Sequence, residues 1–282
     1  MSSAATRVLD FSRAQILLDK AELGVRWAST LERPLPEMVS TGIAAVDALT
    51  GGLPRGALTE IVGLASSGRT SLLLSVLAQS TGRQESCVLV DASGAFDPES
   101  GVAAGIDLKR LLWVSGQPPR AADLWGPGHF PPLERAGRAR DRKKTDPGAH
   151  VEQVLKAADL LLQSGGFGVV ILDLSDIPPA IARRVPLTSW FRFRRAVENT
   201  PTVLLAMEQQ PYAKAAASLV LGLTRSDSQW KTMAPETAPA HARLLGEIEI
   251  IAEVLRSQIA MKKRPASARA HYVLPASWSI RS

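Results

Sequence analysis

One short segment limits the fold of this chain more than any other feature. Residues 63–70 read Gly-Leu-Ala-Ser-Ser-Gly-Arg-Thr, between an apolar run at 57–62 and an apolar helical pattern at 70–79. Two glycines followed by a basic residue and a threonine have the spacing of a phosphate-binding loop. Such a loop connects a strand to a helix, so that backbone N–H groups and the positive helix end face a phosphate. The segment therefore predicts an α/β fold.

Further apolar runs extend this prediction along the chain. Runs without polar alternation occur at 87–91, 111–114, 169–173 and 202–207. Helical patterns occur at 151–163 and 180–199. Apolar strands separated by helices are typical of a parallel sheet that is covered on both faces. Strand-like stretches follow one another without a strong helical pattern between them at 218–224, 247–257 and 268–274, and we expect them to form an antiparallel edge.

The chain divides into an N-terminal appendage and a core. Residues 1–39 contain apolar residues at helical spacing and end near Pro34 and Pro36, which predicts a helical segment. That helix either packs on the core or is offered to a partner subunit. Residues 40–282 form the predicted core domain. A Pro- and Gly-rich insertion at 118–148 interrupts this core.

Two groups of basic residues are candidates for contact with nucleic acid or a partner. The insertion contributes Arg138, Arg140, Arg142, Lys143 and Lys144, which alternatively belong to a solvated linker. The second group is interleaved with aromatic residues, and it comprises Arg192, Arg194 and Arg195. Basic and aromatic residues together suit phosphate contact with base stacking. An amphipathic helix with inward aromatics is the alternative interpretation.

Composition excludes several classes of protein. Lys and Arg number 33 against 27 Asp and Glu, and this mild net charge of +6 fits either an acidic partner or ordinary solubility. The single cysteine, Cys87, excludes an internal disulfide framework and a cysteine-cluster zinc site. No apolar stretch is long enough to span a membrane, and no secretory signal is evident. We therefore expect a cytoplasmic protein.

The candidate nucleotide-binding residues depart from the loop motif at one position. They are Gly63, Ser66, Ser67, Gly68, Arg69, Thr70 and Asp173. Arg69 stands where the motif has lysine, and its planar guanidinium is no conservative replacement for a compact ammonium. Thr70 and Asp173 would be metal ligands only if a magnesium nucleotide binds. Asp173 ends an apolar run, so it is alternatively a turn residue or a helix cap.

In order along the chain, several segments resemble those of RecA-type recombinases. They are residues 40–56, the loop at 63–70, the Asp-Ala-Ser-Gly-Ala-Phe-Asp-Pro segment at 91–98, and residues 254–260. The resemblance covers about residues 40–274. It implies a RecA-like core with a mostly parallel central sheet, antiparallel edge strands and an N-terminal helical segment.

The departures from that pattern concern catalysis. The resemblance implies a catalytic glutamate where this chain has Ser93, and a serine is no base at neutral pH. It implies two lysines at the positions of Arg256 and Gln258. The second DNA-binding loop would be confined to 209–217, with either Gln209 or Glu208 as the residue that senses phosphate. We therefore expect no working recombinase and assign no catalytic residue.

A RecA-like chain with altered catalytic positions is similar to the ImuA family, also described as SulA-related. That resemblance implies a non-catalytic adaptor in SOS-induced translesion DNA synthesis and mutagenesis. The implied partners are ImuB, an error-prone DnaE-type polymerase, RecA, the sliding clamp and single-stranded DNA. No cofactor is required, and ATP with Mg²⁺ is the only one that the motif suggests. The alternative is a DNA-stimulated ATPase or a nucleotide-binding regulator of RecA filaments. A DNA-binding module that uses the basic insertion is a third hypothesis.

Overall fold

The computed structural model describes residues 35–116, 147–232, 243–259 and 269–275. The chain divides into two compact units, Met1–Leu35 and Pro36–Ser282, and the description below concerns the second. The predicted N-terminal helix lies outside the described residues. So do all five basic candidates of the insertion, Arg138, Arg140, Arg142, Lys143 and Lys144.

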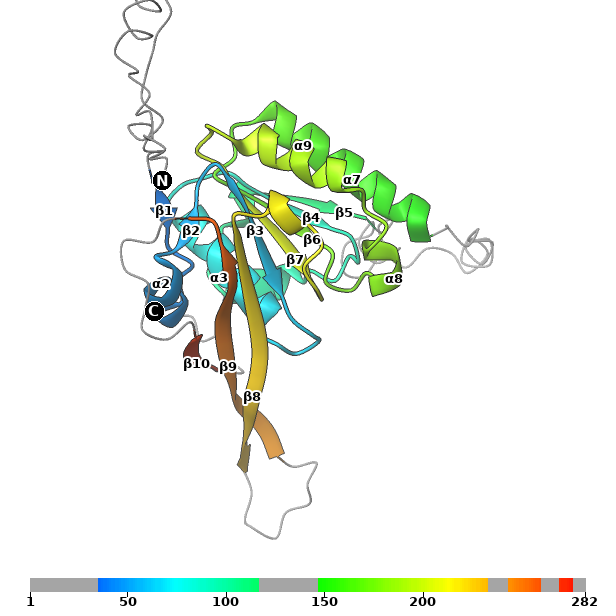
Figure 1. Ribbon diagram of the computed structural model, residues 1–282. Helices are drawn as coiled ribbons and strands as arrows, with labels where there is room; N and C mark the ends of the chain where they lie inside the picture. Colours follow the sequence, from blue (N-terminus) through cyan, green and yellow to red (C-terminus); the bar gives the residue numbers. More distant parts are fainter. Residues whose placement is uncertain (1–34, 117–146, 233–242, 260–268, 276–282) are drawn as a thin grey trace, which may run out of the picture. The chain divides into compact units, whose positions relative to one another are not determined.

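One sheet of eight strands runs through the described part of the core (Figure 1). Six neighbouring strands are parallel, in the spatial order β8 (Leu219–Thr232), β3 (Ala57–Val62), β7 (Val203–Glu208), β6 (Val169–Asp173), β4 (Cys87–Asp91) and β5 (Leu111–Ser115). Beyond β8, the strands β9 (Arg243–Ser257) and β10 (Arg269–Pro275) pair antiparallel. A separate small pair joins β1 (Met38–Val39) to β2 (Leu53–Pro54). The predicted mostly parallel sheet with an antiparallel edge is confirmed.

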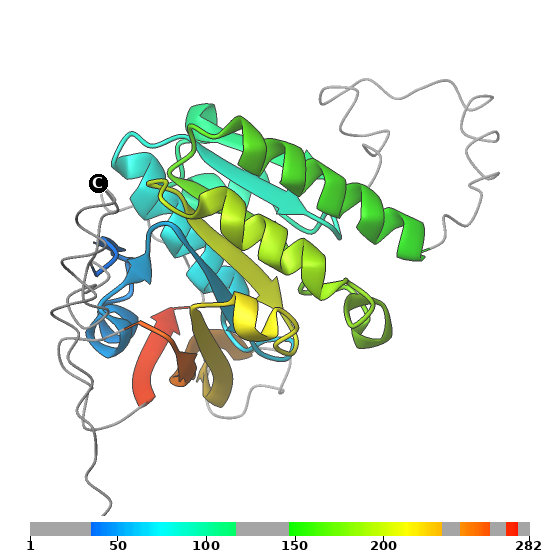
Figure 2. The same cartoon turned by 45° about the horizontal axis from the view of Figure 1, so that its top comes forward.

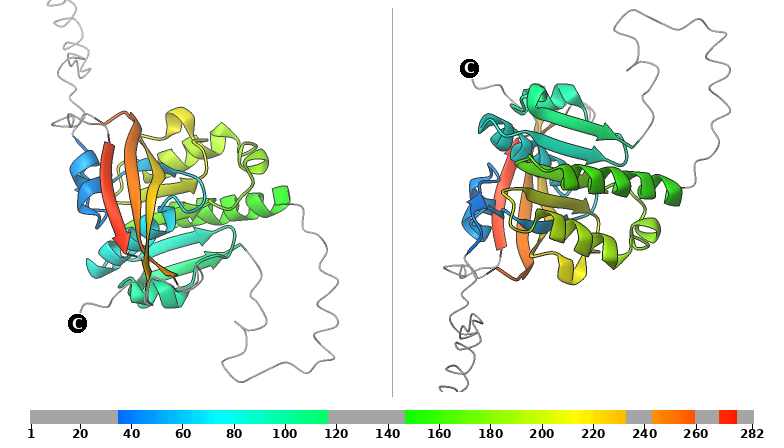
Figure 3. Two further views of the ribbon diagram at one scale, coloured as in Figure 1. Left: turned by 90° about the horizontal axis from the view of Figure 1, so that it is seen from below. Right: turned by 90° about the horizontal axis from the view of Figure 1, so that it is seen from above.

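Helices cover both faces of this sheet (Figures 2 and 3). On one face, α7 (Pro147–Ser164) and α9 (Leu187–Val197) pack on residues such as Leu58 and Val62. On the other, α2 (Ala44–Thr50) and α3 (Arg69–Gly82) pack on residues such as Ile61. Strands that are apolar on both faces need this double cover, which explains their lack of polar alternation. The remaining short elements are α4 (Pro98–Ala103), α8 (Pro179–Ala182), and the 3₁₀ turns η2 (Leu108–Arg110) and η4 (Lys214–Ala216).

The strand register brings polar residues to one edge of the sheet. Asp91 at the end of β4 lies opposite Asp173 at the end of β6. Glu208 at the end of β7 lies opposite Val62, the last residue before the loop at 63–70. The carboxyl ends of parallel strands are where α/β sheets place their ligands. The candidate site is therefore at this edge.

The prediction of one helix over 180–199 is wrong, because the chain forms α8 and α9 with a break between them. Pro186 lacks an N–H and restricts the residue before it, so a helix cannot continue through this position. Within α9, Trp190 and Phe193 are buried and their rings contact edge to face. Phe191 is exposed. Two of the three aromatic residues are therefore part of the core.

The antiparallel strands β8 and β9 are longer than the sequence pattern indicated. They form a long twisted ribbon with three irregularities in its register (Figure 1). Polar residues such as Arg225 and Asp227 lie in this ribbon, where no apolar run marks a strand. In the described part of the chain, no helix combines the length and the apolar character needed to cross a membrane.

Removing the Phe193 side chain should destabilise the core strongly. Phe193 is 1% exposed and Phe191, two residues earlier, is 45% exposed. We expect Phe193→Ala to cost about 3–5 kcal/mol in the free energy of unfolding, because it leaves a cavity beside Trp190. The matched control Phe191→Ala should change it by about 0.5 kcal/mol or less. Urea denaturation measures both, and equal losses would contradict this description of α9.

Candidate functional site

The loop at 63–70 connects β3 to α3, as the motif predicts. Gly68 precedes the helix with a φ of 89°, and Ser66 has a φ of 60°. A methyl group on Gly68 would lie 3.0 Å from Cγ1 of Ile250 and 3.4 Å from Cδ1 of Leu274. A glycine is therefore needed here for both its backbone conformation and its close packing. The strands β9 and β10 lie directly against the loop.

The interior of the loop is closely packed. A methyl group on Gly63 would collide with Oγ of Ser67 and the carbonyl oxygen of Leu223. The Gly63 N–H donates to the carbonyl oxygen of Glu208 at 3.2 Å. The buried Ser67 hydroxyl has no hydrogen-bond partner among the described residues. Thr70, the candidate metal ligand on α3, is exposed.

Arg69 lies buried where the motif has lysine. Its side chain runs from the first turn of α3 to the loop after β6, and only 7% of the residue is exposed. Nη1 donates a long hydrogen bond of 3.4 Å to the carbonyl oxygen of Ser175. Burial lowers the pKa of the guanidinium, and the carboxylates of Asp173 and Asp176 oppose that lowering. Because arginine stays protonated in proteins, a permanent positive charge lies in the site.

Gln209 meets Arg69 at the same carbonyl group. Its Nε2 donates to the carbonyl oxygen of Ser175 at 2.9 Å. Glu208, the alternative phosphate sensor, is fully buried beneath the sheet edge. The structure therefore places Gln209, and not Glu208, beside the loop residue Arg69.

The carboxylate of Asp173 is engaged by its own turn. Its Oδ1 accepts the N–H of Ser175 at 2.9 Å. Burial raises the pKa of this carboxyl group, the bonds from Ser175 lower it, and the nearby carboxylates of Asp91 and Asp176 raise it further. This geometry favours the turn-residue interpretation of Asp173. A magnesium ion there would have to compete with the Arg69 charge.

Ser93 belongs to a turn organised by Asp91. The buried carboxylate of Asp91 accepts the N–H groups of Ser93, Gly94 and Phe96 at 3.1, 2.8 and 2.9 Å. The Ser93 hydroxyl donates to the same carboxylate at 3.2 Å. A hydroxyl held in this way can stabilise a turn, but it cannot take a proton from water as a carboxylate can. The residues present therefore do not fit a centre that hydrolyses a magnesium nucleotide.

Two of the basic candidates on α9 are engaged within the chain. Nε of Arg192 donates to Asp159 at 2.8 Å, and Nη1 of Arg194 donates to the carbonyl oxygen of Ala215 at 3.1 Å. Arg195 is exposed. These contacts fix the Arg192 and Arg194 side chains against the chain's own surface.

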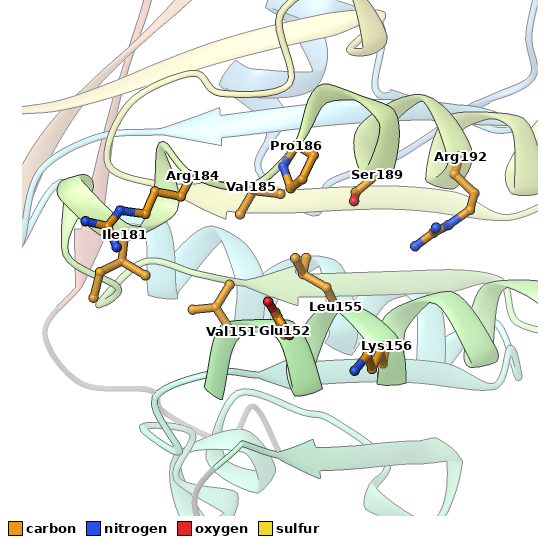
Figure 4. Close-up of a pocket in the computed structure, with 10 residues that line it drawn as sticks. All are labelled: Val151, Glu152, Leu155, Lys156, Ile181, Arg184, Val185, Pro186, Ser189 and Arg192. Carbon is orange, nitrogen blue, oxygen red and sulfur yellow. The ribbon is translucent and has the colours of Figure 1, made fainter. Parts of the chain in front are cut away.

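A groove of about 460 Å³ separates α7 from α8 and α9 (Figure 4). Val151, Leu155, Val185 and Pro186 give it an apolar middle. Arg184 lies at one end, and Lys156 and Arg192 lie at the other; among the described residues, Glu152 is the one acidic residue that lines it. The groove therefore combines an apolar floor with cations at both ends.

Arg256 and Gln258 are turned back onto their own chain. Nη2 of Arg256 donates to the carbonyl oxygens of Lys214 and Ala217, the latter at 3.4 Å. Nε2 of Gln258 donates to the carbonyl oxygen of Ala215 at 3.4 Å. Both side chains therefore hold the η4 turn, whereas the resemblance implied lysines that reach a neighbour's nucleotide.

Comparison with known proteins agrees with this fold and loop. The family model "RecA N-terminal domain" matches residues 28–122. Over these residues the chain is similar to the RecA N-terminal domain. It is 32% identical to "Protein RecA" of Aquifex aeolicus over 146 residues, which are 51% of this chain and 33% of that protein.

Two further relatives show the same partial overlap. "Protein RecA" of Acidiphilium cryptum is 32% identical over 171 residues, 59% of this chain and 40% of that protein. "Protein RecA" of Haemophilus ducreyi is 35% identical over 139 residues, 49% of this chain and 29% of that protein. The chain thus spans between 29% and 40% of the length of these relatives.

Sequence reasoning missed the partners of Arg69 and the neighbours of Glu208. Ser175 is 106 positions away from Arg69, and no local pattern marks a backbone carbonyl as an acceptor. Glu60 is a fully buried carboxyl group inside the apolar strand β3. A lone glutamate in such a run is a signal that sequence reading can find, because a buried carboxyl group requires partners.

Arg69→Ala should destabilise the protein in a pH-dependent way. Removing the buried cation leaves Asp173 and Asp176 without its compensation. We expect a loss of about 1–3 kcal/mol in the free energy of unfolding at pH 7. The loss should shrink as the pH falls, because burial raises the pKa of the Asp173 carboxyl group and a protonated carboxyl group no longer needs a cation.

Arg69→Lys is the matched control, since it keeps the charge but loses the planar group. It should cost less than half as much as Arg69→Ala at pH 7. Urea denaturation at pH 7 and pH 4.5 measures both variants. A loss from Arg69→Ala that is the same at both pH values would show that its charge is not what the site requires.

Proposed function

We propose that this RecA-like chain is a non-catalytic adaptor in SOS-induced translesion DNA synthesis. It acts through contacts with ImuB, with RecA, or with both, near single-stranded DNA. The error-prone DnaE-type polymerase and the sliding clamp are further members of the proposed assembly. The resemblance to the ImuA family supplies this role, and the RecA-like fold and the altered loop site support it.

The observation that carries the proposal is the position of Arg69. Its guanidinium lies buried between the loop and Asp173, hydrogen-bonded to Ser175. A catalytic loop needs a cation that is free to follow the terminal phosphate, together with a carboxylate that orients water. Here the cation is engaged by the protein, and the carboxylate position is Ser93 within the Asp91 turn. A RecA-like fold that hydrolyses no nucleotide still has surfaces that can bind other proteins, and such surfaces are what an adaptor needs.

The groove between α7 and α9 is a surface suited to such a partner. Among the described residues, neither Lys156 nor Arg184 forms an ion pair. An acidic peptide segment with apolar residues at its centre would complement the groove's apolar middle and its cationic ends. We propose that ImuB or RecA supplies that segment.

A nucleotide-binding regulator of RecA filaments is the second candidate. The conformation of Gly68 and the position of the loop at the start of α3 favour it, because this backbone geometry is what cradles a phosphate. Binding without turnover would fit this candidate and would leave the adaptor surfaces intact.

Charge reversal in the groove should weaken partner binding. We expect purified wild-type protein to bind ImuB or RecA at micromolar concentration in calorimetry. The double variant Lys156→Glu with Arg184→Glu should bind tenfold or more weakly, a loss of about 1.4 kcal/mol or more. Lys109→Glu reverses an exposed charge in η2, away from the groove, and is the matched control.

No affinity of the wild-type protein for either partner would remove the adaptor proposal. Equal affinities of the groove variant and Lys109→Glu would remove only the assignment of the groove. Binding to single-stranded DNA that falls steeply with salt, and that the groove variant loses, would favour nucleic acid at this surface instead.

A further inference from the structure

Two fully buried glutamates lie side by side beneath the turn that follows β7. Glu60 in β3 and Glu208 at the end of β7 are both 0% exposed. Glu60 lies opposite Ala206, and Glu208 lies opposite Val62, so the two glutamates are diagonal neighbours on one face of the sheet. No role in the loop site requires two carboxyl groups at this depth.

One backbone N–H joins the two carboxyl groups. The Tyr212 N–H donates to Oε1 of Glu60 at 2.7 Å and lies 3.4 Å from Oε2 of Glu208. The Ala213 N–H donates to the same oxygen of Glu60 at 2.6 Å. The other two oxygens, Oε2 of Glu60 and Oε1 of Glu208, have no hydrogen-bond partner among the described residues. A proton on Glu208 turns one of these two acceptor groups into a donor.

The charges around the pair require that proton. Two adjacent buried carboxylates cannot both be ionised at low cost. The nearest cation is Arg256 of β9, whose Nη2 is 4.0 Å from Oε2 of Glu60. Burial first, and then the charge and hydrogen bond of Glu60, raise the pKa of Glu208 well above its ordinary value. One proton, one carboxylate and one guanidinium leave the cluster neutral.

The other titratable groups near the cluster lie on the turn and on α8 to α9. Burial and the Glu208 charge raise the pKa of the Tyr212 phenol, and Arg183 lowers it. Arg194 of α9 donates to Ala215, and Lys214 lies in the turn itself. None of these cations contacts the two carboxyl groups in the described structure, so Arg256 is the countercharge.

The same residues fasten the segment 209–217 to the sheet. Glu60 accepts the N–H groups of Tyr212 and Ala213, and Arg256 donates to the carbonyl oxygens of Lys214 and Ala217. The segment begins with Gln209, which is hydrogen-bonded to Ser175 beside Arg69. We propose that Glu60, Glu208 and Arg256 form a protonation-dependent latch, which holds segment 209–217 closed and keeps Gln209 in the loop site.

Amide hydrogen exchange of the full-length protein between pH 5 and pH 8 tests the latch. In the closed state, burial and Glu60 raise the pKa of Glu208, whereas in an opened segment the solvated group has an ordinary pKa of about 4.3. Opening therefore releases a proton, and the opening constant should rise with pH, by at most about tenfold per pH unit, after correction for intrinsic exchange. The amides of Tyr212 and Ala213 report it, because their N–H groups donate to the pair.

Glu208→Gln should remove this pH dependence, because the amide carries no titrating proton. The closed state of the variant should also be the more stable one at pH 8, with a melting temperature about 2–4 °C above wild type for each kcal/mol gained. The sign follows from the raised pKa, since the wild-type latch is stable at low pH and weakens as pH rises. Glu198→Gln, at an exposed position after α9, is the matched control and should behave as wild type.

Arg256→Gln is the second variant, which keeps the proposal testable if Glu208→Gln does not fold. This variant removes the countercharge beside Glu60 and the bonds to the carbonyl oxygens of Lys214 and Ala217, so the closed state is less stable and a given loss of protection should be reached at lower pH than in wild type. Equal pH slopes in wild type and Glu208→Gln would overturn the proposal. So would an exchange profile of Arg256→Gln that coincides with that of wild type.

Discussion

A buried guanidinium needs carboxylates and carbonyl groups around it, and the edge of this sheet supplies them to Arg69. The strand register places Asp173 at the end of β6, and the turn that follows presents the Ser175 carbonyl group and Asp176. The loop, the β6 turn and Gln209 are thereby joined through one side chain and one carbonyl oxygen. In a phosphate loop with lysine, the lysine ammonium is free to contact the bound phosphate. In this chain the Arg69 guanidinium is engaged by groups of the protein itself.

The need of buried charged groups for compensating partners also explains the arrangement around Glu60 and Glu208. Glu60 and Glu208 are buried acids, and backbone N–H groups and the nearby Arg256 compensate them. The side chains of Arg256 and Gln258 donate hydrogen bonds to carbonyl oxygens in and beside the η4 turn of the same chain. Away from these two sites, Lys156 and Arg184 line the groove between α7 and α9.

Much of the fold follows from the sequence, because buried parallel strands are continuous apolar runs. The strands at 57–62, 87–91 and 169–173 lie where the pattern placed them. The loop and Arg69 follow from the motif spacing. The sequence did not predict the break at Pro186, because helical spacing continues on both sides of it. It also did not predict the full length of β8 and β9, because their polar outer residues form no periodic apolar pattern. Contacts such as Arg69 with Ser175 depend on tertiary packing, which no local pattern encodes.

Nucleotide turnover by the purified protein tests the central claim most directly. ATP hydrolysis is measured with and without single-stranded DNA, for the wild type and for Arg69→Ala. A guanidinium engaged by Ser175 and a serine at position 93 predict that the wild type hydrolyses no more ATP than Arg69→Ala does. A contradicting result would be ATP hydrolysis by the wild type that single-stranded DNA stimulates and that Arg69→Ala abolishes. It would show that Arg69 acts on phosphate, and it would contradict the proposal of a non-catalytic adaptor.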